Sequence, residues 1–152
     1  MKRRIGILIF AFTVGLGCWN LNQGYPVHAQ EALVMVANKA NAAAAGMTVA
    51  AARKLLLGQT TDWRGGAKVV VVLAPPGSSD RAAVLKKVCG MTESAYTRYE
   101  MQAVFTGATA AKVAESASDS AIREIVKTNS GAVGFLHKSA VDPSVQTVLE
   151  LQ

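Results

Sequence analysis

A continuous apolar run, Val69 to Leu73, constrains the fold of this chain more than any other feature. A strand with no polar face has to be covered on both sides, as in the middle of a sheet that lies between layers of helices. The run ends at Ala74-Pro75-Pro76-Gly77, and Ser78-Ser79-Asp80 then supplies residue types that begin helices. The sequence therefore predicts a central strand, a tight loop and a helix.

Further strands and helices alternate with this unit along the chain. Short apolar runs predict strands at residues 33–37, 132–136 and 145–149. Apolar residues at helical spacing predict helices that begin after Thr48, after Thr92, and at Ser118-Asp119-Ser120, any of which could be the cap. Residues 106–115 read as a loop of small and polar residues. This alternation predicts an α/β fold, with a mainly parallel sheet covered by helices on both faces.

The first 29 residues have the pattern of a cleavable signal peptide. Lys2, Arg3 and Arg4 precede an uncharged apolar run, residues 5–16, which is shorter than the roughly 20 residues that span a bilayer. Val27-His28-Ala29 is a small-residue cleavage pattern, so we expect residues 30–152 to form one exported, periplasmic domain. A retained signal anchor and lipidation at Cys18 are the alternatives.

Charge and cysteine content exclude several classes of protein. Without the three basic residues of the leader, 13 basic and 10 acidic residues remain, a net charge of +3 with no basic run. This balance does not indicate nucleic-acid binding, although it is compatible with a small anionic ligand. Cys89 is the one cysteine of residues 30–152, so no internal disulfide can form there, and its place on an apolar helical stripe predicts a buried thiol.

The predicted loop and helix start at residues 77–81 provide groups that suit an anion. Unpaired backbone amides at a helix start favour negative charge, Ser78 and Ser79 can donate hydrogen bonds, and Arg81 can make a forked contact. A carboxylate at Asp80 would select an oxyanion that carries a proton, such as hydrogen phosphate. The alternative is structural, because serine is an ordinary helix cap and an acidic residue stabilises the first turn.

Other chemistry lacks a basis in the sequence. His137 is the only histidine of residues 30–152 and has no partners at metal-ligand spacing, so we expect neither a metal site nor a cofactor. No nucleophile elbow, P-loop or dinucleotide fingerprint is present, so we expect no enzymatic activity. His137 reads as the surface end of a strand, and Trp63 as a packing residue.

Five segments, taken together and in order, resemble the phosphate-type substrate-binding proteins of ABC transporters, which have a type II periplasmic binding-protein fold. They are LVMVANKAN, LLLGQTTDWRGG, VVVVLAPPGSSDRAAVLKKVCGMTESAY, VFTGATAAKVAES and SGAVGFLHKSAVD, and they cover nearly all of residues 30–152. The resemblance implies ligand-binding roles for the loop from Gly77 to Arg81 and, in a second loop, for Thr106 and Gly107.

Two departures from that family are plain in the sequence. Its full-length members have two lobes that close on the ligand, whereas this chain has the length of one lobe. Their phosphate loop resembles Ser-Gly-Thr, and here the residues are Ser78-Ser79-Asp80. We therefore expect a non-enzymatic solute-binding protein for phosphate or a similar oxyanion, linked to uptake or sensing through a membrane permease. The alternative is a single-lobe envelope module that has lost ligand binding and binds another protein or a second copy of itself.

Overall fold

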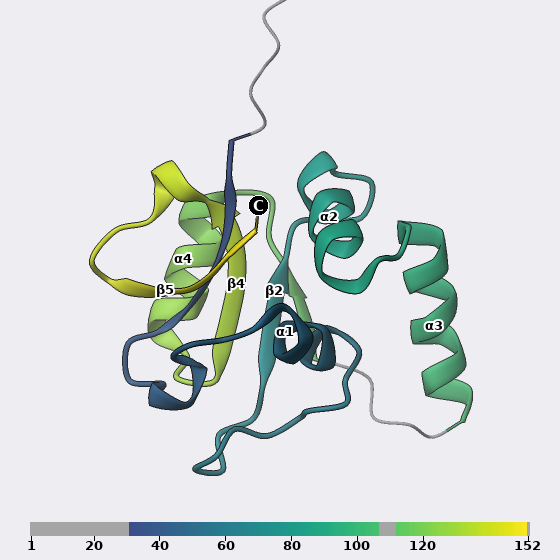
Figure 1. The fold of residues 1–152 in the computed structure, drawn as a ribbon, viewed down its shortest axis with the longest axis horizontal. Coiled ribbons are helices and arrows are strands. Elements are labelled where there is room, and N and C mark those ends of the chain that lie inside the picture. The colour runs from purple at the N-terminus through teal and green to yellow at the C-terminus, as the bar shows by residue number, and fades with distance from the viewer. Residues whose placement is uncertain (1–30, 107–111, 152) are drawn as a thin grey trace, which may run out of the picture.

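The computed structural model describes residues 31–106 and 112–151, and the predicted signal peptide lies outside them. Five strands form one sheet: β1 (Leu33–Asn38), β2 (Val70–Leu73), β3 (Val113–Glu115), β4 (Ala132–His137) and β5 (Val145–Leu151). Four α-helices accompany them: α1 (Val49–Leu56), α2 (Ser79–Val84), α3 (Glu93–Phe105) and α4 (Asp119–Thr128). Short helical turns complete the chain at Ala42–Ala44, Leu85–Cys89 and Lys138–Ala140. Figure 1 shows the arrangement.

The strands lie in the order β3-β2-β4-β1-β5. β2 pairs in parallel with both β3 and β4, whereas β1 is antiparallel to both β4 and β5. Four strands thus share one direction, and β1 alone runs against them. The predicted central strand is β2, and its carboxyl end lies beside the carboxyl ends of its neighbours β3 and β4, where open α/β sheets place their ligands.

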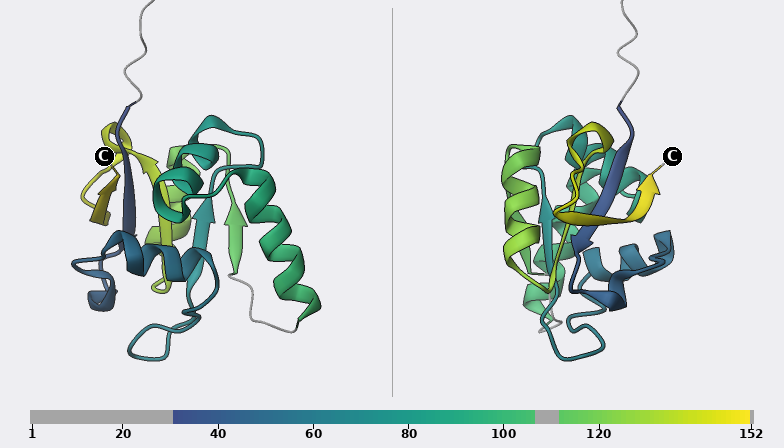
Figure 2. Two further views of the ribbon diagram at one scale, coloured as in Figure 1. Left: turned by 45° about the vertical axis from the view of Figure 1, so that its right-hand side comes forward. Right: turned by 90° about the vertical axis from the view of Figure 1, so that its left-hand side faces the viewer.

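Helices cover both faces of the sheet, as the sequence predicts. Because side chains alternate along a strand, Val34 and Val36 of β1 face α4, and Met35 faces the opposite side. The α4 face is a small apolar cluster that includes Ile122 and Val126. The other face buries a larger cluster with residues from α1, α2 and α3 (Figure 2). Among the described residues, no helix is long and apolar enough to cross a membrane.

Most element boundaries agree with the sequence, and the predicted helix starts are confirmed by their caps. The side chains of Thr48, Ser78, Thr92 and Ser118 each accept a hydrogen bond from the amide three residues later. The predicted loop at residues 106–115 needs correction, since its last three residues form β3. The predicted second helix is also irregular, because α2 continues into a π-helical turn that ends at Gly90, with φ of +68°.

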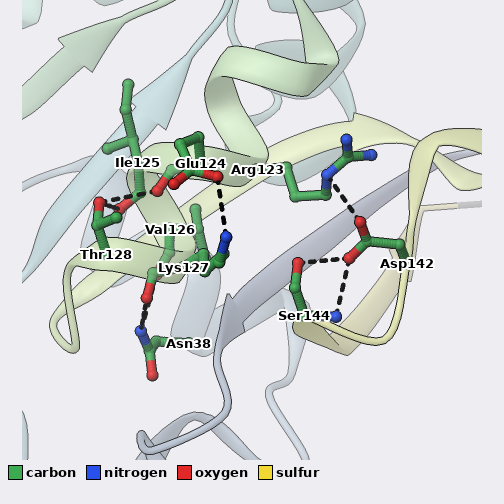
Figure 3. A network of polar contacts seen from close by, with 9 residues as sticks. All are labelled: Asn38, Arg123, Glu124, Ile125, Val126, Lys127, Thr128, Asp142 and Ser144. Atoms are coloured by element: carbon green, nitrogen blue, oxygen red, sulfur yellow. Dashed lines mark hydrogen bonds and ion pairs between the residues drawn. The ribbon is translucent and has the colours of Figure 1, made fainter.

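Side-chain contacts fasten α4 to the sheet at one end and to the β4–β5 connection along its side. The Asn38 side chain, at the end of β1, donates to the carbonyls of Val126 (2.9 Å) and Lys127 (2.7 Å), which the last turn of α4 would otherwise leave unpaired. Arg123 pairs with Asp142 at 3.1 Å, and Asp142 accepts hydrogen bonds from Ser144 (Figure 3). These contacts fix α4 and hence the position of its N-terminus.

Candidate functional site

The candidate site is the loop between β2 and α2, at the carboxyl end of the central strand. Gly77 has φ of +83°, a conformation that favours glycine, and it turns the chain into the helix. Ser78 caps α2, because its Oγ accepts from the Arg81 amide at 3.2 Å. Within the described residues, no acceptor pairs with the amides of Ser79 and Asp80. These two amides remain available to a ligand, whereas the exposed Ser79 hydroxyl donates to Asp80 Oδ1 at 3.3 Å.

Glu93, the first residue of α3, already uses one donor of this loop. The Gly77 amide donates to Glu93 Oε2 at 3.1 Å. A carboxylate of the chain itself therefore accepts from the Gly77 amide, which the sequence analysis assigned to an external anion. Sequence reasoning missed this contact, because Glu93 reads as an ordinary acidic residue in the first turn of a helix.

Arg81 lies beneath the loop and is only 4% exposed. Its Nε lies 3.0 Å from Glu93 Oε1, an ion-pair distance, although the N–H does not point along this contact as a hydrogen bond would. Nη1 lies 3.4 Å from Glu115 Oε1 and 3.3 Å from the Ala74 carbonyl. The guanidinium carbon is also 5.9 Å from the Tyr96 ring centroid. In this structure the Arg81 fork is directed at two carboxylates and supports the loop from below.

His137 belongs to the same end of the sheet. It ends β4, and because β4 and β2 are parallel neighbours, its side chain reaches α2. Nδ1 lies 2.9 Å from Asp119 Oδ2, at the start of α4, and Nε2 lies 3.7 Å from Asp80 Oδ1. The hydrogen bond to Asp119, and the negative charge of both aspartates, raise the pKa of His137. Sequence reasoning placed His137 at a strand end but did not connect it with Asp80.

The local charge balance is acidic. Asp80, Glu93, Glu115 and Asp119 lie around the loop, together with the permanent positive charge of Arg81. Glu100 adds a carboxyl whose pKa is raised by burial, an effect that Arg81 opposes. An anion at this loop would therefore be held by neutral amides and hydroxyls among carboxylates. Such surroundings favour a ligand that brings its own proton, and they become less repulsive when His137 is protonated.

Thr106, the described residue of the second predicted loop, is not brought to the first loop. Thr106 follows the last turn of α3, and its hydroxyl donates to the carbonyls of Gln102 (3.0 Å) and Ala103 (3.2 Å). Glu93 begins α3 beside Gly77, so the 13-residue helix places Thr106 about 20 Å from Glu93. Gly107 lies outside the described residues. The described residues contain no cluster of three or more histidine, cysteine or acidic side chains that could hold a metal ion.

Two further residues of interest are structural. Cys89 is 3% exposed, as the sequence predicts, and burial raises its thiol pKa to about 11. Trp63 is 8% exposed and donates from its indole nitrogen to the Gly131 carbonyl at 2.9 Å. That bond connects the loop before β2 with the start of β4.

Comparison with solved structures relates the fold to known proteins. An ABC-type phosphate transport receptor from Vibrio cholerae is 22% identical, with a TM-score of 0.61 over 78% of this chain and 45% of that one. A putative phosphate ABC transporter substrate-binding protein from Clostridium perfringens, solved with bound phosphate, is 24% identical. Its TM-score is 0.62, and the match covers 78% of this chain and 44% of that one. PstS from Borrelia burgdorferi is 12% identical, with a TM-score of 0.60, and the match covers 78% of this chain and 47% of that one.

The chain has the fold of part of a phosphate-type binding protein. It spans less than half the length of each of these binding proteins, and the likeness, at these identities, concerns the fold. Neither the known protein families nor the curated proteins gave a sequence match. The resemblance inferred from the five sequence segments is thus confirmed at the level of the fold, and the binding-protein neighbours are receptors, not enzymes.

Proposed function

We propose that this chain is an exported, non-enzymatic periplasmic binding protein that holds phosphate or a similar small oxyanion at the β2–α2 loop. One observation carries the proposal: the amides of Ser79 and Asp80 have no acceptor among the described residues, at the carboxyl end of the central strand. Backbone amides at such a position bind oxyanions without a cationic side chain. The bound phosphate of the Clostridium perfringens relative gives the fold a precedent for this ligand.

The acidic surroundings set the expected selectivity. A carboxylate at Asp80 repels sulfate, which carries no proton at neutral pH, but can accept a hydrogen bond from hydrogen phosphate. His137, protonated between Asp80 and Asp119, would offset part of the negative charge. We therefore propose a preference for phosphate over sulfate that strengthens toward lower pH. Delivery to a membrane permease for uptake or sensing would be the cellular role.

Thermal melts with phosphate, sulfate and chloride test this function. A ligand that binds only the folded state stabilises it by about 2.7 kcal/mol at a hundredfold excess over Kd. We expect a melting shift with phosphate, a smaller one with sulfate, and none with chloride at equal ionic strength. Ser79→Ala should weaken the phosphate shift, because it removes an exposed hydroxyl that can turn from Asp80 Oδ1 to the ligand. The absence of an anion-specific shift would contradict the proposal.

A matched pair of cap variants separates binding from folding. Ser78→Ala and Thr48→Ala each remove one helix-capping hydroxyl and should each destabilise the protein by about 1 kcal/mol. Only Ser78 lies at the candidate site, so only Ser78→Ala should also reduce the phosphate shift. Equal effects of both variants on the phosphate shift would show that the shift does not come from this loop.

A second candidate function is a single-lobe module that binds a protein partner, such as a second copy of the chain. It is favoured by α3, whose Met101, Val104 and Phe105 are exposed at 55%, 68% and 88%. Apolar side chains grouped on a helix in this way are typical of interfaces. Mass measurement over a range of protein concentrations tests it, with Phe105→Ser as the variant that should abolish self-association. A monomer at all concentrations would exclude the homodimer.

A further inference from the structure

A cavity of about 320 Å³ lies between α1 and the loop that precedes β2. Met47, Leu55 and Trp63 form its apolar floor, and Lys54, Arg64 and Thr60 stand at its edge. Residues 60–64 come before β2, whereas the candidate anion loop follows it, so the two sites lie at opposite ends of that strand (Figure 1). This cavity is therefore separate from the proposed oxyanion site.

The edge of this cavity has a net positive charge, because the one carboxylate that lines it among the described residues is already paired with a lysine. Asp62 also lines it, but Asp62 Oδ1 pairs with Lys68 at 2.5 Å and Oδ2 accepts from Thr61 at 2.8 Å. No carboxylate of the described residues pairs with Lys54 or Arg64. Two cationic side chains thus stand over an apolar floor with their charges uncompensated by the described part of the chain.

Trp63 lines the cavity, and the polar edge of its indole is hydrogen-bonded elsewhere. The Nε1–H donates to the Gly131 carbonyl at 2.9 Å, so the ring is fixed in place and its remaining surface is apolar. A volume of about 320 Å³ is at the lower end of the range for pockets that bind small molecules. Apolar walls with a few polar groups at one side are the usual composition of such pockets.

We propose that this cavity is a second ligand site, which takes a small organic anion with an apolar body, such as a medium-chain carboxylate. The apolar body would lie on Leu55 and Trp63, and the carboxylate would face Lys54 and Arg64. The two cations orient the ligand, because the reverse orientation would bury its charge against Leu55 and Met47. This inference is independent of the oxyanion function, which uses other residues.

Trp63 fluorescence tests the proposal on a protein of residues 30–152, in which Trp63 is the only tryptophan. We expect a saturable change in emission with hexanoate, and much weaker changes with acetate, which lacks the body, and with hexylammonium, which has the opposite charge. Arg64→Gln and Lys54→Gln should each weaken hexanoate binding about threefold, as for a partly exposed ion pair. Arg98→Gln, an exposed cation on α3, should leave binding unchanged.

A cavity-filling variant completes the test. Ala51 lines the cavity from α1, and Ala51→Leu should block hexanoate without loss of the helix, since leucine is a good helix former. Equal binding of hexanoate and hexylammonium would overturn the proposal, as would unchanged binding in both Arg64→Gln and Ala51→Leu. The absence of any saturable change with hexanoate would also overturn it. Phosphate binding should be unaffected by these variants, which keeps the two sites distinguishable.

Discussion

The Gly77 amide donates to the carboxylate of Glu93 at 3.1 Å, and this contact joins the loop after β2 to the first turn of α3. The same carboxylate lies 3.0 Å from the buried Arg81. Glu93 therefore accepts from one amide of the loop and lies at ion-pair distance from a buried cation, which Glu115 and the Ala74 carbonyl also contact. The protein thus supplies its own anion at this point of the loop.

We predict that Glu93→Gln destabilises the protein more than Glu115→Gln does. Glu93 is mostly buried and closest to Arg81, so its loss leaves a buried cation poorly compensated, at a cost of about 1–3 kcal/mol. Glu115 is half exposed and 3.4 Å away, so its loss should cost less than about 1 kcal/mol. Urea unfolding of both variants measures the difference. Equal costs would show that the Arg81 charge is not held mainly by Glu93.

We predict that the free energy of unfolding decreases as the pH rises through the pKa of His137. The hydrogen bond to Asp119 and the charges of Asp119, Asp80 and Glu31 raise this pKa above its ordinary value of 6.5. The stabilisation is therefore fully present below about pH 6.5 and is lost as the pH passes the raised value.

Urea midpoints between about pH 5.5 and 8.5 measure this dependence, and a histidine NMR titration gives the pKa directly. His137→Gln should flatten the pH profile across this range, since no other histidine occurs in residues 30–152. A wild-type profile that rises with pH in this window would contradict the assignment.

We predict that Gly134→Ala is destabilising by about 1–3 kcal/mol. A Cβ at this position of β4 would lie 2.6 Å from Ile122 Cγ2 and 3.1 Å from Val126 Cγ2, so α4 would have to move. Ile122 is β-branched and cannot easily turn aside. In a double-mutant cycle with Ile122→Ala, the combined cost should be smaller than the sum of the single costs. Strict additivity would show that the close approach does not limit packing here.

We predict that Cys89 does not react with thiol reagents in the folded protein. The side chain is buried, and burial raises its pKa to about 11, so almost no thiolate forms at pH 8. Labelling with iodoacetamide at pH 8 should be slow in buffer and fast in denaturant. Rapid labelling of the folded protein would show that the helix bearing Cys89 opens readily.

The sequence predicts the local structure well where one signal dominates. The sequence predicts helix starts at Thr48, at Thr92, and within Ser78-Ser79-Asp80 and Ser118-Asp119-Ser120. Helices begin at all four places, and the caps are Thr48, Ser78, Thr92 and Ser118. The strand at residues 113–115 was missed because three residues at the edge of a sheet carry no periodic pattern. The antiparallel direction of β1 could not be predicted either, since a strand that is apolar on both faces has the same pattern in either direction.

The candidate site was predictable in its position but not in its contacts. Gly77 and Ser78 mark the end of a strand and the start of a helix, and both signals are local. The ion pairs of Arg81 join three separate elements: Arg81 lies on α2, Glu93 on α3 and Glu115 on β3. The same holds for His137, which meets Asp80 and Asp119 only because β4 lies beside β2. Such groupings depend on strand order, which local pattern does not specify.

A phosphate titration followed by amide NMR tests the central claim most directly. The amides of Ser79 and Asp80 should shift in a saturable way with phosphate, and more at pH 6 than at pH 8, while the Gly77 amide, which Glu93 already holds, should shift less. Sulfate at the same ionic strength should produce smaller shifts. If the Ser79 and Asp80 amides do not respond to phosphate, or respond equally to chloride, the loop is not an oxyanion site.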